Sequence, residues 1–207
     1  MNKLRDKVVL ITGAGKGSGR LLAQAFAEHG AIVAANDISP INVEEVVEQI
    51  VAKGGHAKAY IDDIAKKVAA QNIVKQVEDD FGSIDILINH AAVQPHVSLL
   101  DMDEWDWHRV LDVNLTGAFL MMQSVGRVMR ASSQKGAKGS GVIINLITVR
   151  HEQADAQREA AFIASMCGLD GLTRQARREL SPYGIQVHSV ENHADTVVEN
   201  VFSFLDL

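Results

Sequence analysis

Cysteine is almost absent from this sequence, which contains Cys167 and no other. A single thiol cannot form an internal disulfide or a metal site built from several thiolates, and it is typical of a reducing compartment such as the cytoplasm. Proline is also scarce, with 3 residues, and no tract is rich in Ser, Gln or Glu, which excludes a substantial disordered region. No apolar run approaches the roughly 18 residues of a membrane span, so no membrane partner is expected.

Basic residues are outnumbered by acidic ones. The chain has 20 Lys and Arg against 26 Asp and Glu, a formal net charge of −6 at pH 7. Nucleic acids are bound through a surplus of basic side chains that displaces counterions, and this surplus is missing. The sequence therefore predicts neither nucleic acid nor an anionic membrane as the main partner. Its 207 residues and 47% of hydrophobic residues are ordinary for one soluble domain, which we expect to span 1–207.

Short apolar runs alternate with longer amphipathic segments along the chain. The apolar runs predict buried strands at 8–11, 31–36, 57–61, 84–89, 142–147 and 185–190. The amphipathic segments predict helices at 21–29, 42–53, 65–81, 103–131 and 158–180. This alternation is typical of a parallel sheet covered on both faces. We therefore expect a doubly wound α/β fold of the Rossmann type, with about six strands in a single domain.

The first predicted strand runs into the first predicted helix through the glycine-rich turn TGAGKGSG. Glycine allows positive φ angles and lets main-chain N–H groups approach a pyrophosphate at the N-terminus of a helix. The turn therefore predicts a dinucleotide-binding loop. Its residues are Thr12, Gly13, Gly15, Lys16, Gly17, Ser18 and Gly19. The phosphate-binding loop of an NTPase is excluded, because Gly17 and not Ser or Thr follows Lys16.

Asp37 closes the second predicted strand. A carboxylate at this point can accept hydrogen bonds from both ribose hydroxyls of an adenosine, and it would repel a 2′-phosphate. The alternative is an aspartate that only stabilises the turn before Ser39 and Pro40. Lys16 could instead attract a 2′-phosphate, but a fixed carboxylate in a confined pocket outweighs one flexible lysine. The sequence therefore favours NAD over NADP as the cofactor.

Several further segments make the chain similar to a known family. They are Asp63-Ile64, NHAA at 89–92, WHRVLDVNLT at 107–116 and GLTR at 171–174. Together with Thr-Gly-x-x-x-Gly-x-Gly in the glycine loop, they resemble the short-chain dehydrogenase/reductase family along nearly the whole chain. Within that family the chain resembles members that are similar to the 3-oxoacyl-acyl-carrier-protein reductases. The resemblance implies a Rossmann-type oxidoreductase that uses a nicotinamide dinucleotide and a small carbonyl or alcohol substrate.

The resemblance also implies roles for individual residues. Asp63 and Ile64 fall on the residues that contact adenine, and Asn89 and Ala91 fall in the cofactor-binding Asn-Asn-Ala-Gly segment, here altered at two positions. Asn114 falls on the active-site asparagine that binds a water. Family members pair through the helices that correspond to 102–131 and 158–180, so a homodimer or a higher homo-oligomer is expected.

The catalytic residues of the family are replaced. Thr148 stands at the position of the serine, Phe162 at that of the tyrosine and Met166 at that of the lysine. Reduction of a carbonyl needs a proton donor for the developing alkoxide, and phenylalanine has no proton to give while methionine has no charge. We therefore expect a pseudoenzyme in which Phe162 and Met166 extend an apolar helix stripe, with Cys167 buried beside them.

The sequence is also compatible with two other functions. The chain could be an active oxidoreductase with a non-standard proton donor, such as Thr148 together with Asn114 or a histidine. His90, His151 and His193 fall in segments that would line the cleft, but their spacing fits no metal site and none is expected. The chain could also be a structural partner whose cofactor site is vestigial. Relative to the family, Asn192-His193 replaces a Pro-Gly pair, and the chain stops at Leu207, short of the last helix and strand.

Overall fold

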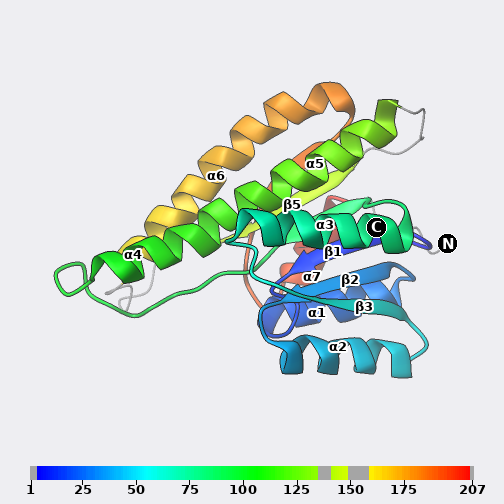
Figure 1. The fold of residues 1–207 in the computed structure, drawn as a ribbon, viewed down its shortest axis with the longest axis horizontal. Coiled ribbons are helices and arrows are strands. Elements are labelled where there is room, and N and C mark those ends of the chain that lie inside the picture. Colours follow the sequence, from blue (N-terminus) through cyan, green and yellow to red (C-terminus); the bar gives the residue numbers. More distant parts are fainter. Residues whose placement is uncertain (1–3, 135–140, 149–158, 206–207) are drawn as a thin grey trace.

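A single parallel sheet of six strands forms the centre of the molecule (Figure 1). The computed structural model describes residues 4–134, 141–148 and 159–205. The strands are β1 (Val8–Thr12), β2 (Ile32–Asp37), β3 (His56–Ile61), β4 (Ile86–Asn89), β5 (Val142–Ile147) and β6 (Gln186–Glu191). Their order in the sheet is β3-β2-β1-β4-β5-β6, which is the doubly wound Rossmann order. The predicted fold class and all six predicted strands are confirmed.

The central strands are buried because both faces of the sheet are covered. All five residues of β1 and all six of β5 are buried. In β1, Val8 and Leu10 face one hydrophobic cluster while Val9 and Ile11 face the other, as the two-residue period of a strand requires. The first cluster is closed by α3 (Lys67–Phe81), α5 (Ala118–Gln134) and α6 (Ala160–Leu180), and the second by α1 (Gly17–Glu28), α2 (Pro40–Ala52) and α7 (Val197–Ser203).

Three helical features differ from the sequence prediction. Helix α1 begins at Gly17 rather than at residue 21, because the glycine loop itself forms the first helical turn. The predicted helix 103–131 is α4 (Glu104–Leu111), a π-helical segment over Asp112–Gly117, and α5. Helix α7 lay outside the prediction and packs on α1 through an edge-on contact of Phe202 with Phe26, with ring centroids 5.0 Å apart.

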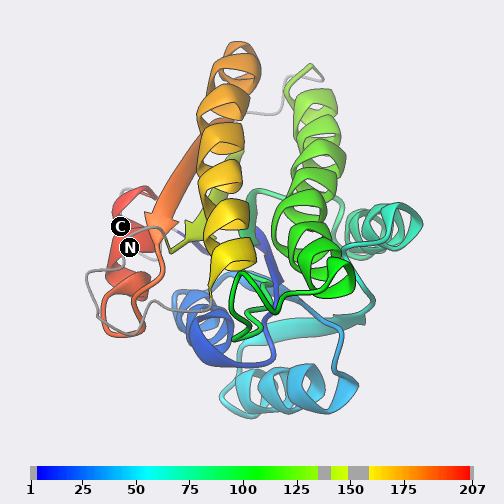
Figure 2. The ribbon, with the colours of Figure 1, turned by 90° about the vertical axis from the view of Figure 1, so that its left-hand side faces the viewer.

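Helices α5 and α6 run side by side on the outside of the molecule (Figure 2). Both are long, and α6 begins at Ala160 in the described part of the chain, whereas the predicted start at residue 158 lies outside it. Among the described residues, no helix is long and apolar enough to cross a membrane.

Candidate functional site

The carboxyl ends of β1 and β4 meet at the point where the order of the strands reverses. In open α/β sheets the ligand binds at this switch point. Here Thr12 joins the two strand ends, because its Oγ1 accepts hydrogen bonds from the N–H groups of His90 at 3.1 Å and Ala91 at 3.2 Å. A cleft of about 260 Å³ lies beside this joint. It is lined by Gly13, Lys16, Asn36, Asp37, Ile38, Ser39, Asn42, Asp62, Asp63, Ile64, His90, Ala91, Ala92, Val93, Arg109 and Val113.

The glycine loop leaves no room for side chains at three positions, Gly13, Gly15 and Gly19, where a Cβ would lie under 3.0 Å from a neighbouring atom. A Cβ on Gly13 would lie 2.8 Å from the Cα of Ala91, and Gly13 has a φ of +66°. A Cβ on Gly19 would collide with the carbonyl oxygen of Gly13 and lie 2.6 Å from Nδ1 of His90. Since α1 begins at Gly17, this closely packed loop presents the N-terminus of a helix to the cleft, where the helix dipole favours an anion.

Asp37 is 8% exposed and bridges the glycine loop and the turn after β2. Its Oδ2 accepts a hydrogen bond from the N–H of Gly15 at 2.9 Å, and its Oδ1 accepts one from the N–H of Ser39 at 3.0 Å. The two predicted roles of Asp37, in the turn and in the cofactor site, are therefore compatible, because the carboxylate stabilises the turn and also lines the cleft. Each oxygen keeps a second lone pair that a ribose hydroxyl could use.

The loop after β3 forms the far wall of the cleft. Asn36 holds this loop in place, since its Nδ2 donates to the carbonyl oxygens of Tyr60 at 2.9 Å and Asp62 at 3.1 Å. Ile64 is buried and lies close to the π-helical segment, where a Cβ on Gly117 would be 3.0 Å from it. Asp63 accepts the N–H of Ala65 at 3.0 Å. This wall offers an apolar surface beside a carboxylate.

The imidazole of His90 packs against the glycine loop, and one of its ring nitrogens is hydrogen-bonded there. Its Nδ1 lies 3.0 Å from the carbonyl oxygen of Gly13. Burial lowers the pKa of the imidazole, an effect that the hydrogen bond with Gly13 opposes only in part. At neutral pH the ring is therefore uncharged, and Nδ1 carries the proton that the carbonyl accepts. His193 is exposed and is not among the lining residues, and His151 lies outside the described residues.

Asn114 lies in the π-helical segment and is 1% exposed. Its Oδ1 accepts the N–H of Val93 at 2.8 Å, and its Nδ2 donates to the carbonyl of Val93 and to Oγ of Ser165, both at 3.0 Å. Ser165 in turn donates to the carbonyl of Phe162 at 2.6 Å. Both amide protons of Asn114 are thus used inside the protein, so its side chain has none to pass to a substrate.

The three positions predicted to correspond to the family's catalytic residues do not line the cleft. Phe162 is 7% exposed and Met166 is 3% exposed, and both belong to the hydrophobic cluster closed by α6. Thr148 is half-buried just after β5. The expectation that Cys167 is buried is wrong: its side chain is exposed. The buried stripe of α6 follows Phe162, Met166 and Leu169, and the next residue after Met166 is turned about 100° away from it.

The structure brings together only part of the predicted site. Gly13, Lys16, Asp37, Asp63, Ile64 and Ala91 line the cleft, and the remaining glycines with Ser18 form the loop behind it. Asn89 is buried away from the cleft, where its Nδ2 donates to Oδ1 of Asn145 at 2.8 Å and ties β4 to β5. No group of three or more His, Cys, Asp or Glu side chains in the described segments could hold a metal ion.

Two residues of α4 and the π-helical segment were missed by the sequence prediction. Arg109 and Val113 both line the cleft. They are four residues apart and therefore share one helix face. The sequence alone could have predicted that they lie on the same face. The sequence could not show that this face is the one that lines the cleft.

Comparisons with known proteins agree with this architecture. The family model for short chain dehydrogenases matches residues 7–194. An uncharacterized oxidoreductase of Thermotoga maritima is 39% identical over 186 residues, which are 90% of this chain and 70% of that protein. The 3-oxoacyl-[acyl-carrier-protein] reductase FabG of Staphylococcus epidermidis is 37% identical over 186 residues, 89% of this chain and 73% of that protein.

Solved structures are similar over nearly the same length. NAD+-bound xylitol dehydrogenase has a TM-score of 0.84 at 31% identity, and the match covers 91% of this chain and 70% of that one. A metagenomic short-chain oxidoreductase in complex with NADP has a TM-score of 0.88 at 27% identity, covering 98% of this chain and 91% of that one. The family model, the relatives and the fold agree, and the chain belongs to the short-chain dehydrogenase/reductase family.

Proposed function

We propose that this chain binds NAD(H) and has lost, or strongly reduced, the carbonyl reductase and alcohol dehydrogenase chemistry of its family. The observation that carries the proposal is the burial of Phe162 and Met166 at the positions of the family's catalytic tyrosine and lysine. A phenyl ring cannot donate a proton, and a thioether has no charge with which to lower the pKa of a neighbouring acid.

The residues of the cleft fit the adenosine diphosphate half of the cofactor. The N–H groups of the glycine loop and the N-terminus of α1 suit the pyrophosphate, and Asp37 suits the ribose hydroxyls. Ile64 and Val113 offer apolar contact to the adenine. A bound nicotinamide dinucleotide supplies a hydride in this family, and the chain must supply the accompanying proton.

The alternative is a working oxidoreductase with an unusual proton donor. In the described part of the chain the candidates are Thr148, Asn114 and His193, and His193 is exposed and does not line the cleft. A hydroxyl without a neighbouring base or cation is a poor acid at neutral pH, and the side-chain protons of Asn114 are already donated to Val93 and Ser165. These contacts favour the binding function over the catalytic one.

We expect NADH to bind at least about fivefold more tightly than NADPH, because two like charges 4 Å apart repel by about 1 kcal/mol even in water. The repulsion would act between Asp37 and the 2′-phosphate. Titration calorimetry with both nucleotides measures the ratio. Asp37→Asn keeps an oxygen acceptor for the N–H of Gly15 and should reduce the ratio of the NADPH and NADH dissociation constants. Lys16→Met should not reduce this ratio. Equal affinities, or tighter binding of NADPH, would make Lys16 the deciding contact.

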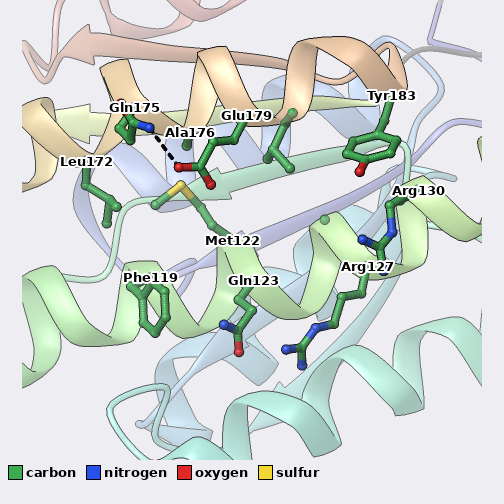
Figure 3. A pocket seen from close by; sticks show the side chains of 12 residues that line it. Phe119, Met122, Gln123, Arg127, Arg130, Leu172, Gln175, Ala176, Glu179 and Tyr183 are labelled. Atoms are coloured by element: carbon green, nitrogen blue, oxygen red, sulfur yellow. Dashed lines mark hydrogen bonds between the residues drawn. The ribbon is translucent and has the colours of Figure 1, made fainter.

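We further propose that the protein forms a homodimer through α5 and α6. A groove of about 310 Å³ lies between these helices, with Phe119, Met122, Leu172 and Ala176 among its lining residues (Figure 3). The groove also carries charges of both signs, which a twofold axis can pair with their opposites on a second copy. They belong to Arg127, Arg130 and Glu179. The side chain of Arg130 lies over the ring of Tyr183, 5.5 Å from its centre.

Two glycine substitutions should separate dimer formation from helix stability. A Cβ on Gly126 would meet only Leu180, at 3.7 Å, and a Cβ on Gly171 meets nothing within 4 Å. Each change to alanine should stabilise its helix by up to about 1 kcal/mol, as measured by chemical denaturation of the dilute protein. Only Gly126 lines the groove, so Gly126→Ala alone should weaken the dimer about tenfold in sedimentation experiments, the cost of overfilling a packed interface. An unmodified chain that is monomeric at micromolar concentration would contradict the proposal.

A further inference from the structure

His90 lies against the most closely packed part of the glycine loop. Its Nδ1 lies 3.0 Å from the carbonyl oxygen of Gly13, and its main-chain N–H donates to Oγ1 of Thr12 at 3.1 Å. A Cβ on Gly19 would lie 2.6 Å from the same Nδ1. Among the histidines that the structure describes, only His90 lines the cleft. A change in the charge of this imidazole therefore changes the electrostatic potential at the loop itself.

The hydrogen bond with Gly13 leaves the second ring nitrogen of His90 available for a proton. Since a carbonyl oxygen only accepts, Nδ1 carries the proton of the neutral ring and Nε2 carries the lone pair. Within the described segments, no group is hydrogen-bonded to Nε2. Protonation at Nε2 therefore breaks no hydrogen bond, and Nδ1 can still donate to Gly13.

The surroundings of His90 keep the imidazole neutral in the free protein at pH 7. Burial lowers the pKa of His90 below its ordinary value of 6.5, although the hydrogen bonds with Gly13 and Thr12 oppose this effect. Two charged side chains act in opposite directions, because the carboxylate of Asp37 raises the pKa and the ammonium group of Lys16 lowers it. The other charged side chains that line the cleft are Asp62, Asp63 and Arg109. Further negative charge at the loop would shift this balance toward the imidazolium ion.

We propose that dinucleotide binding is coupled to the uptake of a proton from solvent by Nε2 of His90, so that the site binds its ligand more tightly in mildly acidic than in neutral solution. This inference rests on the proposed dinucleotide binding and adds a regulation of the same site. The diphosphate of the ligand brings two negative charges to the loop that His90 contacts, and they favour the imidazolium ion.

The direction of the pH dependence follows from the direction of this shift. The pKa of His90 is lower than usual in the free chain and is raised in the complex. The extra affinity is therefore fully present below the pKa of the free chain, and it is lost as the pH rises through the pKa of the complex. Because an imidazole titrates near neutrality, this change falls in the range from about pH 5 to pH 8.

Titration calorimetry of the full chain with NAD+ between about pH 5.5 and pH 8 tests the inference, because NAD+ is stable in mild acid and its diphosphate keeps its charge over this range. We expect affinity to be about fivefold higher at the acidic end. Repeating the titration in two buffers with different ionisation enthalpies counts the protons taken up, which should approach one per NAD+ near the pKa of the complex. An affinity that is constant or rises with pH would overturn the inference and leave the proposed function standing. If NAD+ binds at no pH, both fall.

Two histidine substitutions assign the effect to a residue. His90→Asn keeps a side-chain amide that can donate to the carbonyl of Gly13 but cannot titrate, so its affinity for NAD+ should be independent of pH. The matched control is His56→Asn at the amino end of β3, which should keep the pH dependence of the unmodified chain. If His90→Asn kept this dependence, another group would take up the proton and the proposal would be wrong.

The titration of His90 can also be followed in the unmodified chain, which does not require a variant to fold. The imidazole C–H signals in an NMR titration give the pKa of each histidine. The signal of His90 should report a higher pKa with saturating NAD+ than without it, whereas that of His56 should not change. A pKa of His90 that stays the same or falls on binding would contradict the coupling.

Discussion

Turnover of carbonyl or alcohol substrates by this chain is expected to be undetectable, or lower by several orders of magnitude than that of a family member with the complete Ser, Tyr and Lys set. General acid catalysis alone contributes roughly 10²–10⁴-fold to such a reaction. Here Phe162 removes the proton donor and Met166 removes the cation that would tune it. A spectrophotometric screen measures the residual activity, by NADH oxidation with a broad set of aldehydes and ketones and by NAD+ reduction with a broad set of alcohols.

The double variant Phe162→Tyr with Met166→Lys tests whether the rest of the site is still competent. Met166 is buried in the hydrophobic cluster, so an unpaired lysine there should cost a few kcal/mol of unfolding free energy. The variant must therefore be checked for folding and NADH binding before its activity is interpreted. Phe162→Tyr alone is the matched control, because it restores the proton donor without the cation.

The outcomes of this experiment differ clearly. Activity in the double variant alone would mean that Thr148 and Asn114 are still aligned and that the chemistry was lost at this pair. A folded, NADH-binding double variant without activity would mean that the nicotinamide side has been lost more widely. Robust turnover by the unmodified chain would contradict the proposed loss of function. If substitution of Thr148 or His193 then abolished this turnover, the substituted residue would be identified as the proton donor.

Substitution of Gly19 by alanine is expected to weaken NADH binding by about 100-fold or more, because overpacking at a main-chain contact costs several kcal/mol. A Cβ at this position would collide with the carbonyl oxygen of Gly13 and lie 2.6 Å from Nδ1 of His90. The carbonyl is main chain and cannot rotate away, so the loop must move out of the position in which its N–H groups face the cleft. Calorimetry gives the affinity.

Gly17→Ala is the control for this prediction. Gly17 also belongs to the loop and has a φ of +55°, but a Cβ there meets nothing within 4 Å. The left-handed backbone alone should cost about 1–2 kcal/mol of stability. Its effect on NADH affinity should stay within about tenfold. If Gly19→Ala bound NADH as tightly as Gly17→Ala does, the close approach of Gly19 to the carbonyl oxygen of Gly13 would not be needed for binding.

The features that could be predicted from the sequence are those that depend on neighbours along the chain. A strand covered on both faces is predominantly apolar, so β1 and β5 stand out as apolar runs that are interrupted only by Thr12 and Asn145. The positive φ angles of Gly13 and Gly17 follow from a turn that other residues adopt only with strain. Asp37 was predicted at the end of β2 and is there, and its side chain lines the cleft.

Other features were decided only when distant segments came together. Three examples are the exposure of Cys167, the hydrogen bond from Asn89 to Asn145 and the position of Arg109 in the lining of the cleft, which depend on which helix face meets which strand end. Helix α7 is short, and its apolar residues are buried only because it packs against α1 and β6. Local periodicity is a property of the chain alone. A hydrogen-bond partner or a buried face is chosen by the packing of elements far apart in sequence, and the periodicity of one element does not specify the surface of another.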